Sequence, residues 1–426
     1  MNTLSILLIN VNTYPKVFVY PIGLDYLVSS LRSNDYSSID TLDLALHPRS
    51  TFKTKILEML SSKKYDVIGF SFRNLTDQLY QGQTYTNSLS DLLYFVDDFV
   101  KKNQLSTSVI LGGSACSLLP KKLVETLPID HIVYGDGEDA FLLILRSIER
   151  KTALSKELRL PVHMEKSEYT RGSWGFVEEY QNRGAMANIQ TKRGCSKQCV
   201  YCSYPVIEGK IFRMREASCV ASEMLQIEKL GFNQVYIVDA TFNHPLLHSK
   251  WVLEAFKKHH VSAKWTAFFN PLIDQELLTL IKETNMAYPM KFTIESGSDR
   301  MLESLQKGFD TTAIRRACRL CRENDIPFSF TILFGAPGET KETVLETCRF
   351  IKEMNPAYVS SSIGVFIYPK TKLAEMTKGN VWHSEDELLG ETVFPYDRKL
   401  IKSILHQELD DTGIPFLVND EAEVFN

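Results

Sequence analysis

Apolar runs alternate with helix-patterned segments along most of this chain, and this alternation constrains the fold more than any other feature. The apolar run Leu4–Val11 predicts a buried parallel strand. Further strands are expected at Ile39–Leu44, Asp66–Ser71, Ser108–Leu111 and His131–Val133, and helices at Gly23–Arg32, Phe52–Leu60, Leu89–Val100 and Ala140–Ile148. This pattern predicts a Rossmann-like, doubly wound α/β sheet over residues 1–150.

A second series of strand–helix units follows after residue 185. Strands are expected at Ala187–Thr191, Val235–Val238, Ala263–Ala267, Met290–Ile294, Ser329–Leu333 and Tyr358–Ile367, and a helix follows each of the first five. Six such units predict a partial (β/α)6 barrel over residues 186–371, with its ligands at the carboxyl ends of the strands. We expect residues 151–185 to be a linker and residues 372–426 to be a short helical tail that closes the barrel. Ser218 and Asp274 are expected to cap the helices that follow them.

Glycines stand at two strand ends of the first unit, where an α/β sheet binds its ligands. Gly112 and Gly113 end one strand, and Gly135 and Gly137 follow the next. A glycine there allows the backbone to approach a ligand closely, although it can equally well serve only a tight turn.

Three of the eight cysteines lie on one segment, with the spacing Cys-x3-Cys-x2-Cys at Cys195, Cys199 and Cys202. Structural zinc requires four ligands, and no fourth Cys or His follows at a suitable spacing. A disulfide is unfavourable in a cytosolic chain. Three thiolates on one polar loop suit a [4Fe–4S] cluster with one open iron, whereas three structural core cysteines would not explain the polar flanking residues.

This spacing, with the aromatic Tyr201 before the third cysteine, resembles the radical SAM superfamily. The resemblance implies that the open iron binds S-adenosylmethionine (SAM), whose sulfonium then receives one electron. It also implies that SAM contacts lie at the ends of the barrel strands. Four motifs resemble those of the superfamily: Asp239-Ala240-Thr241-Phe242, Ile294-Glu295-Ser296-Gly297-Ser298, Phe334–Thr340 and Tyr368-Pro369-Lys370-Thr371. The expected SAM-site residues are Tyr201, Asp239, Ala240, Thr241, Glu295, Ser296, Gly335 and Ile367. Lys370 replaces a glycine of the family turn, which argues against a tight turn there.

The first 150 residues resemble the cobalamin-binding domain of B12-dependent radical SAM enzymes. The resemblance rests on Tyr20–Leu24, Ile110–Gly113 with Leu119-Pro120, and Tyr134–Phe141. It implies that the residues around cobalamin are Tyr14, Gly23, Ser71, Phe72, Gly112, Gly113, Gly135, Gly137 and Glu138. The loop after the first strand has no His to bind cobalt. Three alternatives follow. Cobalt has no His ligand, Tyr14 or another side chain faces the cobalt, or cobalamin does not bind at all.

The other five cysteines are predicted to be core residues. Cys318 and Cys321 share one face of a helix, where the alternative is an auxiliary cluster or a redox pair. A net charge of −4 gives no indication of nucleic-acid binding. There is no apolar run of membrane-spanning length and no signal-peptide pattern, so a cytoplasmic chain is expected.

Together, the resemblances imply an enzyme that methylates an unactivated carbon of a small-molecule or peptide substrate by means of a 5′-deoxyadenosyl radical and methylcobalamin. Its electron donor would be a protein such as flavodoxin or ferredoxin. One alternative is a cyclase, a rearrangement enzyme or a transferase of another part of SAM. Another is a non-catalytic cobalamin or cluster sensor.

Overall fold

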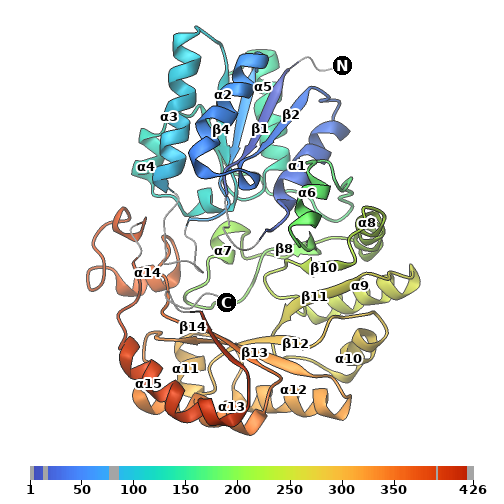
Figure 1. Ribbon diagram of the computed structural model, residues 1–426, viewed down its shortest axis with the longest axis vertical. Helices are drawn as coiled ribbons and strands as arrows, with labels where there is room; N and C mark the ends of the chain where they lie inside the picture. Colours follow the sequence, from blue (N-terminus) through green and yellow to red (C-terminus); the bar gives the residue numbers. More distant parts are fainter. Residues whose placement is uncertain (1–3, 13–17, 76–85, 390–391, 420–426) are drawn as a thin grey trace.

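The computed structural model describes residues 4–12, 18–75, 86–389 and 392–419. These residues form two parallel β-sheets, each flanked by helices and placed one above the other in Figure 1. The chain builds the upper sheet first and then the lower one, so both expected α/β units are confirmed.

The upper sheet has six parallel strands in the order β2-β1-β3-β4-β5-β6. Their bounds are β1 Ile6–Asn10, β2 Ile39–Asp43, β3 Val67–Ser71, β4 Ser108–Gly112, β5 His131–Val133 and β6 Glu157–Leu158. The helices are α1 Ile22–Ser33, α2 Phe52–Ser62, α3 Thr86–Lys102, α4 Lys121–Thr126 and α5 Glu138–Arg150. All five residues of β1 are buried, as expected for a central strand that helices cover on both faces.

The lower sheet has seven parallel strands in the order β15-β14-β13-β12-β11-β10-β7. Their bounds are β7 Ala187–Ile189, β10 Gln234–Ile237, β11 Lys264–Phe269, β12 Met290–Glu295, β13 Phe328–Phe334, β14 Val359–Ile363 and β15 Phe416–Asn419. The helices are α8 Ala217–Lys229, α9 Leu246–Lys258, α10 Gln275–Lys282, α11 Asp299–Ser304, α12 Thr311–Glu323, α13 Lys341–Met354, α14 Lys372–Thr377 and α15 Arg398–Leu409. A two-stranded hairpin, β8 Lys192–Arg193 and β9 Arg213–Met214, brackets the cysteine segment and the short helix α7 Tyr204–Ile207.

The six expected strands of this barrel are confirmed, and β15 is a seventh that the sequence did not indicate. It comes from the tail and pairs with β14, with Phe416 opposite Val359. β15 is only four residues long, so its own pattern carries little strand signal, and the pairing depends on the neighbouring edge. The tail is therefore both helical and part of the sheet.

Helix starts follow local capping chemistry where a suitable side chain is available. The Asp274 carboxylate accepts the Leu277 N–H at 3.0 Å and begins α10, as predicted. The prediction for Ser218 is wrong. Helix α8 begins at Ala217 after Glu216, so Ser218 already lies in the first turn.

Residues 151–185, expected as a linker, pack against both sheets. Strand β6 extends the upper sheet at one edge, and α6 (Val177–Asn182) contacts the end of β2 through Tyr180. Asp43, at the end of β2, accepts the indole N–H of Trp174 at 2.8 Å and the hydroxyl of Tyr180 at 2.9 Å. Because this carboxylate is 1% exposed, the two bonds compensate for its loss of water.

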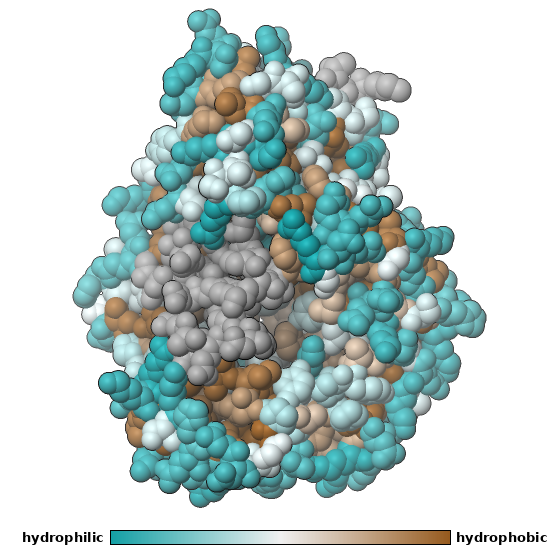
Figure 2. Space-filling model, viewed as in Figure 1, coloured by the Kyte–Doolittle hydropathy of each residue, from teal (hydrophilic) through white to brown (hydrophobic). Residues whose placement is uncertain are grey.

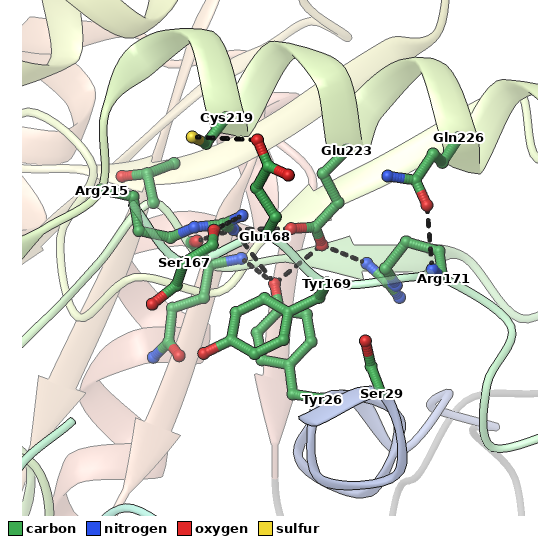
Figure 3. A network of polar contacts seen from close by, with 12 residues as sticks. Tyr26, Ser29, Ser167, Glu168, Tyr169, Arg171, Arg215, Cys219, Glu223 and Gln226 are labelled. Carbon is green, nitrogen blue, oxygen red and sulfur yellow. Dashed lines mark hydrogen bonds and ion pairs between the residues drawn. The ribbon is translucent and has the colours of Figure 1, made fainter. Parts of the chain in front are cut away.

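A buried polar network joins the two sheets through the same segment (Figure 3). Arg171 forms ion pairs at 2.7 Å with Asp25 of α1 and with Glu223 of α8. Tyr26 donates to Glu223 at 2.8 Å, and its ring stacks on Tyr169 at a centroid distance of 3.8 Å. A buried charge that loses its partner is strongly destabilising, so the network is one of the contacts that join α1 of the upper unit to α8 of the lower unit.

The face of the molecule in Figure 2 is mostly hydrophilic, with separate apolar patches between the hydrophilic residues. None of the helices in the described parts of the chain is both long and apolar enough to cross a membrane.

Candidate active site

The cysteine loop runs between β8 and α7 and is anchored by backbone contacts on both sides. Cys195 donates its N–H to the Gly209 carbonyl at 3.1 Å, and Val200 donates to Leu305 at 3.2 Å. Gly194 has a φ of +94°, and a Cβ there would lie 2.2 Å from the Ile211 carbonyl oxygen. The glycine before the first cysteine is therefore required by the hairpin itself.

The three thiols lie on one loop and none forms a disulfide. Burial raises the pKa of Cys195, and it raises that of Cys202 to about 12, with further increases from the neighbouring cysteines. Thiolates this close repel one another, which raises their pKa values, and a bound cation would lower these pKa values. Within the described ranges, no three Cys, His, Asp or Glu side chains are already arranged to hold a metal ion. The fit to a cluster therefore rests on the donor chemistry, and the ligand assignment stays a prediction.

Tyr201 connects this loop to the end of β12. Its hydroxyl donates to Oε1 of Glu295 at 2.6 Å, and the ammonium of Lys307 reaches the same oxygen at 2.8 Å. Burial is the largest single effect and disfavours the Lys307 charge, but Glu295, together with Cys199 and Cys202, raises the lysine pKa overall. Lys307 was not among the expected SAM-site residues, although Lys307-Gly308 belongs to the sequence motif around Glu295.

Glu295 is placed unusually for a buried carboxylate. It lies at a register shift in the β12–β13 pairing, has a φ of +67° and is 7% exposed. Its second oxygen, Oε2, is buried and has no hydrogen-bond partner among the described residues. An unpaired buried acceptor at a strand end fits a ligand that donates hydrogen bonds, such as a ribose diol or an amino group.

Asp239, expected near the methionine part of SAM, has both oxygens engaged within the protein. Its carboxylate accepts the Thr191 N–H at 2.8 Å and the Lys192 ammonium at 2.6 Å. It therefore holds the chain that leads into the cysteine loop. Ala240 and Thr241, the next two residues expected at the SAM site, follow Asp239 directly. The Thr241 hydroxyl donates to the Ala240 carbonyl at 2.8 Å.

Gly335 and Ile367 lie where the tail covers the ends of β13 and β14. A Cβ on Gly335 would lie 2.8 Å from the ring of Tyr396, and the Tyr396 hydroxyl donates to Ile363 at 3.0 Å. Ile367 is buried and donates its N–H to Thr392 at 2.9 Å. Ser296 turns inward, with its hydroxyl 3.0 Å from that of Thr347.

A cavity of about 860 Å³ lies between the two sheets, at the upper end of the roughly 300–1,000 Å³ typical of ligand pockets. The register of the upper sheet aligns Asn10, Ser71 and Gly112, whose strand ends form one wall. The opposite wall includes Val238, Phe268, Ser203, Tyr204, Ile207 and Glu208.

Most residues expected around cobalamin line this cavity: Gly23, Ser71, Gly112, Gly113, Gly135, Gly137 and Glu138. A Cβ on Gly23 or Gly137 would meet nothing within 4 Å, so the backbone faces open space that a large planar ligand could approach. Phe72 is buried in the core and contributes its backbone beneath Gly113. Tyr14 lies outside the described residues.

Two basic residues connect the upper sheet to the lower one at this cavity. Lys370 adopts a φ of +63°, so the tight turn forms without glycine, contrary to our expectation. Its ammonium donates to the carbonyls of Ser117 and Leu119, each at 3.1 Å. Arg193, which comes two residues before Cys195 and was not an expected site residue, pairs with Glu138 at 2.7 Å. Such partners are far apart in the sequence, so no local pattern could have indicated them.

The remaining cysteines are buried in the structure, as expected for core residues. Cys318 and Cys321 are 0% exposed, and burial raises the pKa of each to about 12. Both side chains belong to the hydrophobic core of the lower unit, which supports the core interpretation.

Two stacked α/β units that meet at a cavity beside a three-cysteine loop define a class of enzyme with two cofactor domains. The family model described as Radical SAM superfamily matches residues 189–351, and the B12 binding domain matches residues 10–145. The chain therefore belongs to the B12-binding radical SAM enzymes, and the expected cofactors, a [4Fe–4S] cluster, SAM and cobalamin, are those of the class.

Similar proteins include an uncharacterized methyltransferase of Pyrococcus horikoshii, 25% identical over 383 residues that cover 84% of this chain and 79% of the relative. Among solved structures, the radical SAM methyltransferase TsrM from Kitasatospora setae, bound to tryptophan and a SAM analogue, has a TM-score of 0.77 at 22% identity. That match covers 89% of this chain and 77% of TsrM. OxsB, with aqua-cobalamin and SAM bound, has a TM-score of 0.72 at 16% identity, over 94% of this chain and 56% of OxsB. These structural likenesses show the fold.

Proposed function

We propose that this chain is a cobalamin-dependent radical SAM methyltransferase that methylates an unactivated carbon of a small-molecule or peptide substrate. One observation carries the proposal: a single cavity is lined both by the strand-end glycines of the B12-binding unit and by residues next to the cysteine loop. A substrate in this cavity would lie beside bound cobalamin and next to the cysteine loop, and such positioning lowers the entropic barrier of a group transfer.

When bound, the cluster and SAM supply a carbon-centred radical and cobalamin supplies the methyl group. The residues proposed to hold the cluster are Cys195, Cys199 and Cys202. Those proposed to surround SAM are Tyr201, Asp239, Ala240, Thr241, Glu295, Ser296, Gly335 and Ile367. The unpaired Oε2 of Glu295 would accept a hydrogen bond from SAM, while Lys307 and Tyr201 hold Oε1 and orient the carboxylate. Asp239 would act through Thr191 and Lys192, by holding the start of the loop.

For cobalamin, the proposed surroundings are Gly23, Ser71, Phe72, Gly112, Gly113, Gly135, Gly137 and Glu138, together with Tyr14. The glycines would admit the ligand to the backbone, and the apolar lining would exclude water from a reactive carbon centre. The electron is proposed to come from a donor protein such as flavodoxin or ferredoxin.

The test uses the anaerobically purified, cluster-reconstituted chain with cobalamin, SAM and a chemical reductant, and a panel of amino acids and short peptides. UV–visible spectra with iron and cobalt assays establish the cofactor content, and chromatography measures the products. We expect S-adenosylhomocysteine and 5′-deoxyadenosine to form together. If 5′-deoxyadenosine forms alone, methyl transfer is refuted in favour of a cyclase or rearrangement. If SAM is not cleaved at all, the chain is not a catalyst of this type.

The contribution of Glu295 is tested by the Glu295→Gln variant. Glutamine preserves the shape of the side chain but leaves the Lys307 charge without its partner. We expect weaker SAM binding by about tenfold or more, because a charge-assisted bond is lost in a buried site. The exposed Glu353→Gln is the matched control and should bind SAM as the unchanged chain does.

A further inference from the structure

An ion pair between Glu138 and Arg193 joins the two cofactor-binding loops. Glu138 begins α5, directly after the glycines that line the cavity, and Arg193 ends β8, two residues before Cys195. The guanidinium meets the carboxylate with both arms, at 2.7 and 3.1 Å. The two side chains are 8% and 6% exposed, so the pair lies almost entirely out of water.

On the cluster side, Arg193 is tied to the backbone of the cysteine loop. Its Nε donates to Gln190 at 2.9 Å, and Gln190 donates to Glu208 at 2.8 Å. The other oxygen of Glu208 accepts the Gly194 N–H at 3.0 Å. A shift of the Arg193 side chain would therefore be felt at the residue that precedes the first cysteine.

On the corrin side, a second carboxylate of the same loop also points at Arg193. Oδ1 of Asp136 lies 3.1 Å from the guanidinium, and the Tyr169 hydroxyl donates to Glu138 at 3.1 Å. Burial is the largest single effect and raises the pKa of Glu138, but Arg193, together with a backbone hydrogen bond and the Tyr169 hydroxyl, lowers the pKa overall. The carboxylate is therefore held ionised. Because both Glu138 oxygens already have protein partners, its position depends on Arg193.

We propose that Arg193 is a positioning residue that makes the order of the cysteine loop and the occupation of the cobalamin cavity depend on each other through Glu138. The inference rests on the proposed function, since it needs both cofactors. A buried ion pair that loses one partner is strongly unfavourable, so neither loop can move away without the other following. Coupling of this kind is reciprocal: if the cluster tightens cobalamin binding, cobalamin stabilises the cluster by the same factor.

The experiment measures the dissociation constant of hydroxocobalamin by absorbance titration, for the chain with its cluster and for the chain after the cluster has been removed. In the unchanged chain we expect binding to be about fivefold or more tighter with the cluster present. In Arg193→Lys the charge stays but the two-armed contact is lost, so this ratio should fall to about one. In parallel, adding cobalamin should change the electron paramagnetic resonance spectrum of the reduced cluster in the unchanged chain but not in the variant.

The matched control is Arg171→Lys. Arg171 is also buried and pairs with carboxylates of α1 and α8 but not with Glu138, so its variant disturbs the contact between the two units and leaves the Glu138–Arg193 pair in place. It should keep the ratio of the unchanged chain. Should Arg193→Lys fail to fold, Glu138→Gln tests the same contact from its other end. A ratio near one in the unchanged chain overturns the proposal. The proposal is also overturned if the Arg193→Lys or Glu138→Gln variant keeps the ratio of the unchanged chain, or if the Arg171→Lys control loses it. Failure of either cofactor to bind at all would refute the proposed function instead.

Discussion

Two adjacent glycines at the end of β4 offer the sharpest test of the cavity, because the structure gives them different roles. Gly113 has φ +106° and ψ 160°, a region that only glycine adopts readily. A Cβ there would lie 2.4 Å from the Phe72 carbonyl oxygen. At Gly112 the nearest atom to an added Cβ is the Val133 Cβ, at 3.9 Å, and the residue lines the cavity.

The two alanine substitutions should therefore differ in stability. For Gly113→Ala, the backbone conformation costs about 1–3 kcal/mol, and the forced movement of the Phe72 backbone costs about 1–3 kcal/mol more. For Gly112→Ala the change should stay within about 1 kcal/mol and can be stabilising, because alanine restricts the unfolded chain. Urea denaturation, followed by circular dichroism, measures both free energies of unfolding.

The larger Gly112→Val then tests the ligand. Its branched side chain suits a strand and would extend into the cavity. We expect the cobalamin content to fall at least tenfold, equivalent to about 1.4 kcal/mol of binding free energy, while the iron content stays unchanged. The reasoning is refuted if Gly112→Ala destabilises the protein as much as Gly113→Ala does, or if Gly112→Val still binds cobalamin fully.

Two further predictions concern the cysteine loop and its support. Replacing any one of Cys195, Cys199 and Cys202 with alanine should abolish the cluster absorption near ~400 nm and SAM cleavage but leave cobalamin binding intact, because the cluster needs all three thiolates. Activity that survives in any one of these variants would exclude the ligand assignment. Burial and the nearby Lys192 lower the pKa of His248 to about 4, so the folded protein keeps this residue neutral while the unfolded chain takes up a proton below about pH 6.5. Stability from this residue should be complete above pH 6.5 and decline by about 3 kcal/mol toward pH 4. The His248→Gln variant should show a flatter pH profile of urea midpoints, and an equally steep profile would contradict the assignment.

Local patterns were sufficient for most of the elements and for the identity of the cofactor class. The run at β1 predicted its own burial, since a central parallel strand needs apolar residues on both faces. The cysteine spacing predicted a single loop because the three residues are close in the sequence. β15 was missed because a short edge strand is stabilised by its neighbour rather than by its own residues.

Pairings between distant residues could not be predicted. The sequence indicated that Glu295 belongs to the site, but only the fold brings Lys307 and Tyr201 to one of its oxygens and leaves the other buried and unpaired. For Gly113 the sequence left open whether the glycine serves a ligand or only a tight turn, and the structure shows that the Phe72 backbone requires a glycine there.

The sequence by itself determined two α/β units, the order of their strands along the chain and a loop with three thiols, since each depends on residues that are neighbours in the chain. The tertiary structure alone decided how the units face each other, which glycines border the cavity and which carboxylates are left for a ligand. Those features depend on contacts such as Glu138–Arg193, whose partners lie 55 residues apart. Their energy depends on burial that exists only when both sheets have packed together.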